Sequence, residues 1–190
     1  MNYKIAEISD IEATLKLHAK YQIDSINEKD KKDGFVTTAF SNEELAQLIE
    51  QEQGLFIAKE GEEVLAYVMS ASWDFWSKWA MFQHMIADLP NLSYKGQQLT
   101  TQNSYQYGPI CIDKSVRGTA VLSDIFNFAL KEMSKRYPIL ITFVNQINPR
   151  SFEAHHRKLG LDMIQGFEFN ENRYWELGCE TSEYVNLTNL

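Results

Sequence analysis

The chain has 190 residues, of which 44% are hydrophobic and 23% are charged. These values are ordinary for a folded protein, and the length is enough to bury a core without disulfides. The 18 basic and 26 acidic side chains give a net charge of −8, which disfavours a general nucleic-acid binder or a protein that docks on anionic membranes.

The first third of the chain is predicted to hold three strands and two helices. The strands are expected at 3–8, 55–59 and 63–70, and the helices at about 10–25 and 41–53. Ser41 and Glu44 have the spacing of a capping box at the start of the second helix. Gly61 lies in the turn between two apolar runs, so the second and third strands are predicted to form a β-hairpin.

The segment 72–104 differs from the rest in composition. Aromatic and apolar residues at 75, 79, 82 and 86 have helical spacing, and a polar stretch follows at 97–104. We therefore expect an insertion between strands, made of one aromatic-faced helix and a loop. Two uses stay open: the segment extends the core or closes a homodimer, or it lines an acceptor cleft with 92–104 as a lid.

The remaining chain alternates strands and helices. Strands are predicted at 110–112, 139–144, 161–168 and 172–178, helices at about 120–136 and 148–159, and a polar tail at 180–190. Asn170 and Glu171 form the turn of a second hairpin. This order predicts an α/β fold with a mixed sheet, organised as a single domain over 1–190.

The turn between the strand at 110–112 and the next helix is a candidate anion site. It contains Arg117 and Gly118, directly before the helix. Backbone amides at a helix N-terminus attract anions, Gly permits close approach, and Arg adds a charge-assisted contact. Ordinary turn chemistry explains the same residues, so the stretch alone decides little.

A second stretch, 148–161, follows the most apolar strand. It begins Asn148-Pro149-Arg150-Ser151 and places His155 and His156 near the end of a helix. A histidine titrates near neutral pH and can act as a general acid. The competing interpretation is a cluster of solvated cations at a helix C-terminus.

Together the two stretches resemble the cofactor-binding half of the GNAT-type N-acetyltransferases. The family pattern is a strand, then Arg or Gln, two residues, Gly, one residue, and Gly or Ala, which opens a helix. A strand follows, then Asn-Pro-x-Ser and a helix ending in Leu-Gly-Phe. The resemblance covers nearly the whole chain except 72–104 and the tail. It implies the GNAT fold: a mixed central β-sheet flanked by helices, here with a helical, aromatic-rich insertion between strands.

The resemblance also implies acetyl-CoA or another acyl-CoA as co-substrate, and no metal is expected from the spacing of the histidines and cysteines. The diphosphate would rest on the backbone of Gly118, Thr119, Ala120, Val121 and Leu122, with Arg117 at its edge. The pantetheine arm would pair with Ile110, Cys111 and Ile112, and the motif residues Asn148 and Ser151 belong to the same cofactor site.

The sequence departs from the family pattern in two places. Ala120 stands where the family has Gly, and Leu122 where it has a small residue, which puts the affinity for CoA in question. There is also one extra residue between Ser151 and Leu159. Counting back from Leu159 puts His156 at the place of the family's Tyr, which protonates the thiolate, whereas counting forward from Asn148 puts His155 there. We favour His156, because the phase at the Leu-Gly end should fix the side chain nearest the thioester.

The base that takes the proton of the amine stays open among Asp113, Tyr107 and His84, each of which also has a structural interpretation. Cys111 could be a nucleophile, but a buried strand cysteine usually packs as a small hydrophobe. Two distant cysteines form neither a disulfide framework nor a zinc site, and the four histidines lack metal-ligand spacing. Without a signal-peptide pattern or a long apolar run, we expect a cytoplasmic protein.

The expected function is transfer of an acetyl group from acetyl-CoA to a primary amine of a small molecule, by direct attack on the thioester. Two alternatives stay open. One is a non-catalytic binding module with a degenerate diphosphate loop, favoured by Ala120 and Leu122. The other is acetylation of a protein N-terminus or lysine, with the aromatic segment as a peptide groove.

Overall fold

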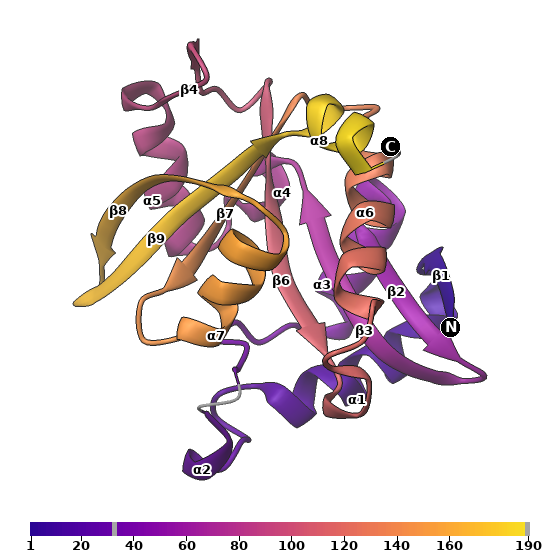
Figure 1. Ribbon diagram of the computed structural model, residues 1–190. Helices are drawn as coiled ribbons and strands as arrows, with labels where there is room; N and C mark the ends of the chain where they lie inside the picture. Colours follow the sequence, from indigo (N-terminus) through magenta and orange to yellow (C-terminus); the bar gives the residue numbers. More distant parts are fainter. Residues whose placement is uncertain (32–33, 189–190) are drawn as a thin grey trace. The chain divides into compact units, whose positions relative to one another are not determined.

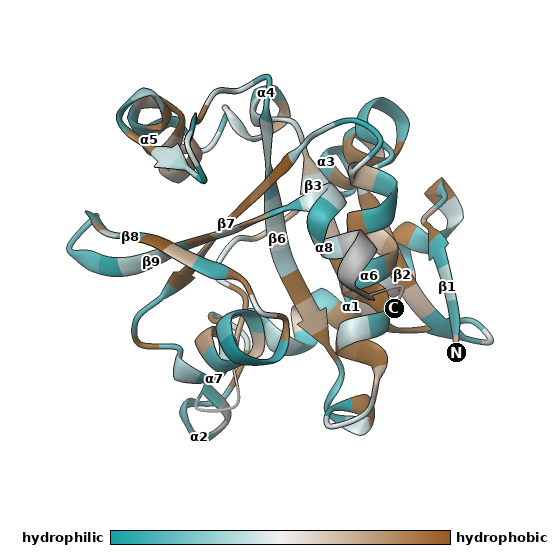
Figure 2. Cartoon of the chain, turned by 45° about the horizontal axis from the view of Figure 1, so that its top comes forward, coloured by the Kyte–Doolittle hydropathy of each residue, from teal (hydrophilic) through white to brown (hydrophobic). Residues whose placement is uncertain are grey.

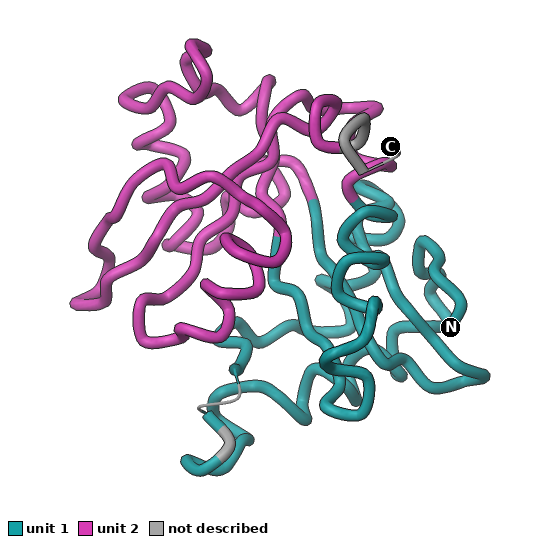
Figure 3. Tube along the Cα trace, in the orientation of Figure 1, with its two compact units in different colours: residues 1–70, 108–129 teal, residues 71–107, 130–190 magenta. Residues whose placement is uncertain are grey.

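The structure, a computed structural model, describes residues 1–31 and 34–188 (Figure 1). The chain forms two compact units, which are shown in different colours in Figure 3. Unit 1 comprises Met1–Ser70 and Gly108–Ala129, and unit 2 comprises Ala71–Tyr107 and Leu130–Leu190. No helix of the described residues is both long and apolar enough to cross a membrane.

The sheet of unit 1 has the strand order β1-β2-β3-β6. Its strands are β1 (Asn2–Ile5), β2 (Leu55–Glu60), β3 (Glu63–Ala71) and the second half of β6 (Ser104–Ile112). β1 and β3 both pair antiparallel with β2. The predicted hairpin at 55–70 is therefore confirmed, with Gly61 at a φ of 57° in its turn. The first strand is shorter than expected because residues 8–10 form a 3₁₀ turn, η1 (Ile8–Asp10).

Helices cover both faces of this sheet. In the antiparallel register Phe56 lies opposite Val68 and Ile57 opposite Tyr67, so Phe56 and Tyr67 point to opposite faces. The ring of Phe56 meets Phe128 of α6 (Val121–Met133) edge-on, at 5.9 Å between centroids. On the other face the hydroxyl of Tyr67 lies 2.7 Å from Nδ1 of His18 in α1 (Ile11–Tyr21).

Two further helical segments of unit 1 precede the hairpin. α2 (Glu28–Lys31) is a single turn in the expected charged break, whose residues 32–33 lie outside the described part. α3 (Asn42–Gln47) packs against α1 and continues as the π-helical turn η2 (Leu48–Glu52). The predicted capping box is confirmed, since Ser41 Oγ accepts from the amide of Glu44, whose carboxylate accepts from that of Ser41.

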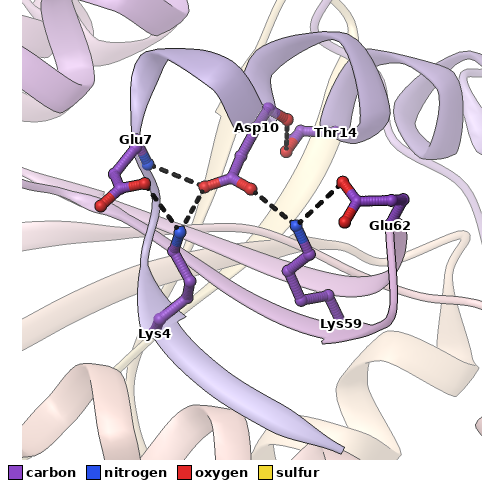
Figure 4. Close-up of polar contacts among 6 residues, drawn as sticks. All are labelled: Lys4, Glu7, Asp10, Thr14, Lys59 and Glu62. Carbon is purple, nitrogen blue, oxygen red and sulfur yellow. Dashed lines mark hydrogen bonds and ion pairs between the residues drawn. The ribbon is translucent and has the colours of Figure 1, made fainter.

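A buried carboxylate ties the start of the chain to the hairpin (Figure 4). Asp10 is 3% exposed and accepts from Lys4 Nζ at 2.9 Å, Lys59 Nζ at 3.0 Å and the amide of Glu7 at 2.9 Å. Burial would raise the pKa of Asp10, but these donors together lower it below its ordinary value. The ion pairs therefore join η1, β1 and β2.

The sheet of unit 2 has the order β6-β7-β9-β8. β6 pairs in parallel with β7 (Ile139–Asn145), over 104–106 and 139–141. β9 (Asn172–Glu180) lies antiparallel between β7 and β8 (Asp162–Phe169). β7 is mostly brown, that is apolar, in Figure 2, as expected for a central strand. The predicted hairpin is confirmed, and both turn residues, Asn170 and Glu171, have positive φ.

Unit 2 also carries helices on both faces. Successive residues of β9 point to opposite sides, so Tyr174 and Trp175 mark the two faces. Trp175 meets Phe152 of α7 (Pro149–Phe152) at 6.2 Å. Tyr174 stands 5.6 Å from Phe143, whose other neighbour is Phe82 of α5 (Ala80–Asp88) at 5.8 Å. α7 and α5 therefore pack on opposite faces of this sheet.

The segment 72–104 differs from the prediction in two respects. Instead of one helix it forms α4 (Trp73–Trp76), capped by Ser72, and α5, which the short turn η3 (Leu89–Asn91) follows. The expected loop contains a small hairpin, β4 (Ser93–Tyr94) and β5 (Gln97–Gln98). β6 begins at Ser104, well before the predicted strand at 110–112, and its residues Tyr105 and Tyr107 are buried.

The end of the chain forms a helix that the sequence analysis did not predict. The expected polar tail at 180–190 contains the helix α8 (Thr181–Thr188), and residues 189–190 lie outside the described part. This helix begins at Thr181. The Thr181 hydroxyl donates to the carbonyl of Tyr137 at 2.8 Å, and the Thr181 amide donates to the carbonyl of Pro138. The mixed α/β fold class is confirmed: counting β6 once, the two strand orders comprise seven strands, with helices on their faces.

Candidate functional site

The turn between β6 and α6 in unit 1 is built on Asp113. Its Oδ1 accepts from the amide and the hydroxyl of Ser115, at 2.9 and 2.8 Å, and starts the 3₁₀ turn η4 (Lys114–Val116). Its Oδ2 accepts from Lys20 at 2.5 Å and from the Tyr21 hydroxyl at 3.3 Å. Burial would raise the pKa of Asp113, but Lys20 and Ser115 lower it to about 2. A carboxylate held so firmly in its ionised form is a weak base, so these contacts favour a structural role.

Arg117 lies across the same turn. Its Nε donates to the carbonyl of Ile112 at 2.8 Å, and its guanidinium stands 4.8 Å from the centre of the Tyr21 ring. The cation is therefore held by the end of β6 and by α1. This placement gives Arg117 a role in the turn as well as the charge that an anion site needs.

The N-terminus of α6 presents its backbone to solvent. Gly118 has a φ of 81°, and Gly118, Thr119 and Ala120 are all exposed. The amide of Asp124 bonds to the carbonyl of Ala120 at 2.9 Å, so the helical ladder starts there. The amides of the first turn have no partner within the helix by its geometry, although that of Val121 reaches Thr119 Oγ1 at 3.3 Å. These amides and the helix dipole can hold an anion.

The two departures from the family pattern occupy different environments here. Ala120 is exposed, and its methyl group extends into solvent at the start of the turn. Leu122 is half-buried, one residue after the buried Val121. The side chain at 122 is therefore partly turned away from solvent, while its amide belongs to the exposed first turn.

The strand before the turn places Cys111 inside unit 1. Ile110 and Ile112 are half-buried, whereas Cys111 is buried and lies beside Tyr67 of β3. Burial raises the pKa of the Cys111 thiol to about 12. A thiol that stays protonated at neutral pH is a poor nucleophile, which favours packing over covalent catalysis.

In unit 2, the motif at 148–151 is a helix start. Asn148 is buried, and its Oδ1 accepts from the amide of Ser151 at 3.1 Å, while Pro149 stands where the missing amide costs nothing. The Asn-Pro-x-Ser pattern thus has a local physical reason. Asn148 and Ser151 were predicted as cofactor residues; here both also shape the helix that carries the histidines.

The extra residue in this helix appears as a π turn. α7 passes into η5 (Glu153–Lys158), and the amide of Leu159 bonds to the carbonyl of Ala154, five residues back. A π turn holds one more residue than an α turn, so both ends of the helix keep their own phase. The forward and backward counts that gave His155 and His156 therefore start from two ends of the helix that differ in phase.

His155 is enclosed in unit 2. It is 4% exposed, its Nδ1 donates to the carbonyl of Ser151 at 2.7 Å, and no described residue bonds its Nε2. The ring meets that of Tyr107 edge-on at 5.7 Å. Burial lowers the pKa of His155, so the neutral ring is the form present at pH 7. The sequence-predicted residues His155, Ser151 and Tyr107 are thus brought together.

His156 is half-buried and more open to solvent. Its Nδ1 lies 2.7 Å from the carbonyl oxygen of Leu161, and its ring packs against that of Phe152, tilted by 33° with 5.0 Å between centroids. Because a carbonyl can only accept, Nδ1 carries the proton and Nε2 carries the lone pair when the ring is neutral. A fixed ring with one available nitrogen suits proton transfer better than the enclosed His155.

The other candidate bases have structural surroundings. Tyr107 is buried on β6, and burial raises the pKa of its hydroxyl well above the ordinary value, so it does not ionise near pH 7. Its carbonyl accepts from the Thr142 hydroxyl at 2.7 Å. His84 is exposed on α5, with its ring against Phe167 and Phe169 of β8. Neither arrangement singles out a base.

One titratable residue escaped the sequence analysis. Glu176, in the middle of β9, is 1% exposed, and burial raises the pKa of its carboxyl to about 7. The signal was present as an acid between the large apolar residues Trp175 and Leu177 in a predicted strand. Its significance depends on the strand register, which the sequence does not state.

Comparisons with known proteins give different results for the sequence and for the fold. No protein-family model matches the sequence, and no curated protein matches it. Solved structures do match over 95% of this chain. One is smu.2055 of Streptococcus mutans UA159, with a TM-score of 0.63, 14% identity and 99% of that chain covered. Another is a ribosomal-protein-alanine N-acetyltransferase from Brucella melitensis, with a TM-score of 0.61, 13% identity and 99% of that chain covered.

A third match is yncA, a putative acetyltransferase from Salmonella typhimurium in complex with its cofactor acetyl-CoA. Its TM-score is 0.62 at 10% identity, with 93% of that chain covered. At such low identity these likenesses bear on the fold. They confirm the GNAT fold that the sequence predicted.

Proposed function

We propose that this chain is an acetyl-CoA-dependent N-acetyltransferase whose acceptor is the primary amine of a small molecule. One observation carries the proposal: in a chain with the GNAT fold, β6 leads through Arg117 and the exposed residues 118–120 into a helix whose first-turn amides have no partner within the helix. Such a turn fits a diphosphate. A solved structure of the same fold is described with acetyl-CoA as its cofactor.

In this proposal the amides of 118–122 bind the diphosphate, and Arg117 adds a positive charge at its edge. The exposed methyl of Ala120 leaves the approach to the turn open, and Leu122 contributes its amide while its side chain is partly buried. The strand residues 110–112 bind the pantetheine arm. The fit rests on the open helix N-terminus and on the cation beside it.

The reaction proposed is direct transfer. The lone pair of a neutral amine attacks the thioester carbonyl carbon, a C–N bond forms, and the C–S bond breaks. A proton reaches the sulfur, while the nitrogen loses one, so the products are an amide and a free thiol. We assign the proton donor to His156, because its ring is fixed through Nδ1 and its imidazolium form carries a second proton, on Nε2, that it can give to the sulfur.

A second candidate function is acetylation of a protein or peptide amine. It is favoured by the match to a structure described as a ribosomal-protein-alanine N-acetyltransferase. A third, non-catalytic binding, is favoured by the departures at Ala120 and Leu122. These alternatives differ in measurable ways, because only the third predicts no acetyl-CoA turnover.

The test is calorimetric titration of the purified protein with acetyl-CoA and, separately, with CoA. Micromolar binding is expected. An acceptor screen then compares small primary amines with peptides bearing free N-termini or lysines, with release of the CoA thiol as the readout. Absence of binding at millimolar acetyl-CoA would refute the proposal in favour of the non-catalytic module, and turnover of peptides alone would favour the second candidate.

A further inference from the structure

Of the two carboxyl oxygens of Glu176, one accepts a hydrogen bond from a described residue and the other does not. Its Oε2 accepts from Gln165 Nε2 on β8 at 2.8 Å. No described residue donates to its Oε1, although the side chain is 1% exposed. Buried carboxyl oxygens without partners are costly and uncommon, so this atom calls for an explanation other than packing.

Aromatic rings surround this position on the same face of the sheet. Phe143 is the direct cross-strand partner of Glu176, and Tyr174 lies two residues before it on β9. The Phe143 ring stands 5.6 Å from Tyr174 and 5.8 Å from Phe82 of α5. Aromatic faces attract cations, and a carboxylate beside them adds the matching charge.

The side-chain amide of Gln165 links Glu176 to a second carboxylate, that of Asp88. Gln165 Nε2 also donates to Asp88 Oδ2 on α5 at 2.8 Å, so the amide bridges the two acids. Hydrogen bonds from Gln165 and Asn91 lower the pKa of Asp88, which therefore stays ionised. Burial first, and then the charge of Asp88, raise the pKa of Glu176 to about 7.

Few other titratable groups face this pair. His84 lies on α5 one turn before Asp88, and Tyr174 stands on the strand of Glu176 itself. Burial raises the pKa of Tyr174, so its hydroxyl stays neutral near pH 7. Glu176 is therefore a carboxyl group with a pKa near neutral pH, buried beside aromatic rings and a second acid, and its Oε1 accepts no hydrogen bond from a described residue.

We propose that Glu176 is the residue of unit 2 that receives the acceptor amine, with Oε1 accepting an N–H of its ammonium group and the rings of Phe143 and Tyr174 lying beside it. The inference rests on the proposed acetyltransferase function and narrows its substrate to cationic primary amines. Glu176 then takes one proton: the N–H bond of the ammonium breaks, an O–H bond forms at Oε1, and the neutral amine keeps its lone pair for attack.

This assignment fills the place of the base that Asp113, Tyr107 and His84 leave open. A base with a pKa near the working pH combines a deprotonated fraction with enough basicity. An ammonium bound at Oε1 would also pair the oxygen that lacks a partner.

The test compares Glu176→Gln with Glu168→Gln, which removes the same charge from an exposed position on the adjacent strand β8. Protein labelled with ¹³C at the glutamate carboxyl is titrated with pH by NMR, alone and with methylammonium, n-butylammonium or 2-phenylethylammonium chloride. Methanol, n-butanol and 2-phenylethanol are the neutral controls. The resonance missing in Glu176→Gln identifies the group.

The ammonium salts are expected to lower the titration midpoint of Glu176 and the alcohols to leave it unchanged, in the wild type and in Glu168→Gln alike. With acetyl-CoA and an amine that the wild type acetylates, Glu176→Gln should lower kcat/KM at pH 7 by about 10²-fold. The deficit should shrink at alkaline pH, where the amine is already neutral. Glu168→Gln should stay within about twofold of the wild type.

The outcomes separate this inference from the proposed function. If acetyl-CoA binds but no ammonium moves the Glu176 midpoint, or if Glu176→Gln keeps its kcat/KM, the inference is overturned and the acetyltransferase proposal stands. If the ammonium salts shift the midpoint but acetyl-CoA does not bind, the amine site stands and the acetyltransferase proposal is overturned.

Discussion

Replacing Asp10 by Asn should destabilise the protein by about 3 kcal/mol. The substitution keeps the shape of the side chain and an oxygen for the Glu7 amide, but removes the buried charge that Lys4 and Lys59 share (Figure 4). Each lost charge-assisted hydrogen bond contributes roughly 1.5 kcal/mol. The sum lies in the lower part of the range of about 3–5 kcal/mol for breaking a buried pair.

The control is Glu62→Gln, which removes the same charge beside the same Lys59. Its carboxylate is fully exposed and lies 3.9 Å from Nζ, so its loss should leave the denaturation midpoint unchanged. Both variants are measured by urea denaturation at pH 7 with circular dichroism. Equal shifts in the two variants would refute the reasoning that burial of Asp10 makes its charge valuable.

The pH dependence gives an independent check. The pKa of Asp10 is lowered in the folded protein, so the unfolded chain binds the proton first as the pH falls. The stability that the charge contributes is complete above the unfolded pKa, roughly 4, and is lost as the pH falls through the folded value. The difference between wild type and Asp10→Asn should therefore persist at pH 5–7 and shrink below about pH 4. A difference that stays constant down to the folded pKa would contradict the ion-pair account.

Three further predictions concern the candidate site. Arg117→Ala should weaken acetyl-CoA binding about tenfold in calorimetry, which is the equivalent of one charge-assisted hydrogen bond. The control, Lys135→Ala, beyond the C-terminal end of α6, should leave the affinity unchanged. Equal affinities in the two variants would show that Arg117 does not belong to the cofactor site. His156→Phe should lower kcat about 10²-fold without changing the affinity for acetyl-CoA, and the same result from His155→Phe alone would move the proton donor to that residue. Cys111→Ala should keep kcat within about threefold in an assay of CoA release, because a thiol with a pKa of about 12 is protonated at pH 7; complete loss of turnover would indicate covalent catalysis.

The local signals predicted most of the elements. The apolar alternation and turn residues gave the hairpin of β8 and β9, and the capping box at Ser41 and the cap at Asn148 gave two helix starts. These features depend on residues close in the chain, where sequence spacing and spatial distance agree. The fold class followed from their order.

The features that the sequence analysis did not predict depend on contacts between residues far apart in the chain. The break between α4 and α5 lies at 77–79, which contain no Gly or Pro, while the rings of Trp76, Trp79 and Phe82 pack together across it. Glu176 became a candidate only through its register with Phe143 and Gln165 on two other strands. The spacing of residues in the sequence does not show which residues of different strands lie opposite one another.

The π turn at 153–158 has a consequence for how this helix tolerates change in length. A single inserted residue would rotate everything after it by about 100° in a regular α-helix. Here the widened turn takes up that rotation locally, so Asn148 keeps its cap and the Leu159-Gly160 end keeps its own orientation. The widened turn thus lets the helix carry one residue more than a regular α turn, and both adjacent histidines, the buried His155 and the half-buried His156, lie within it.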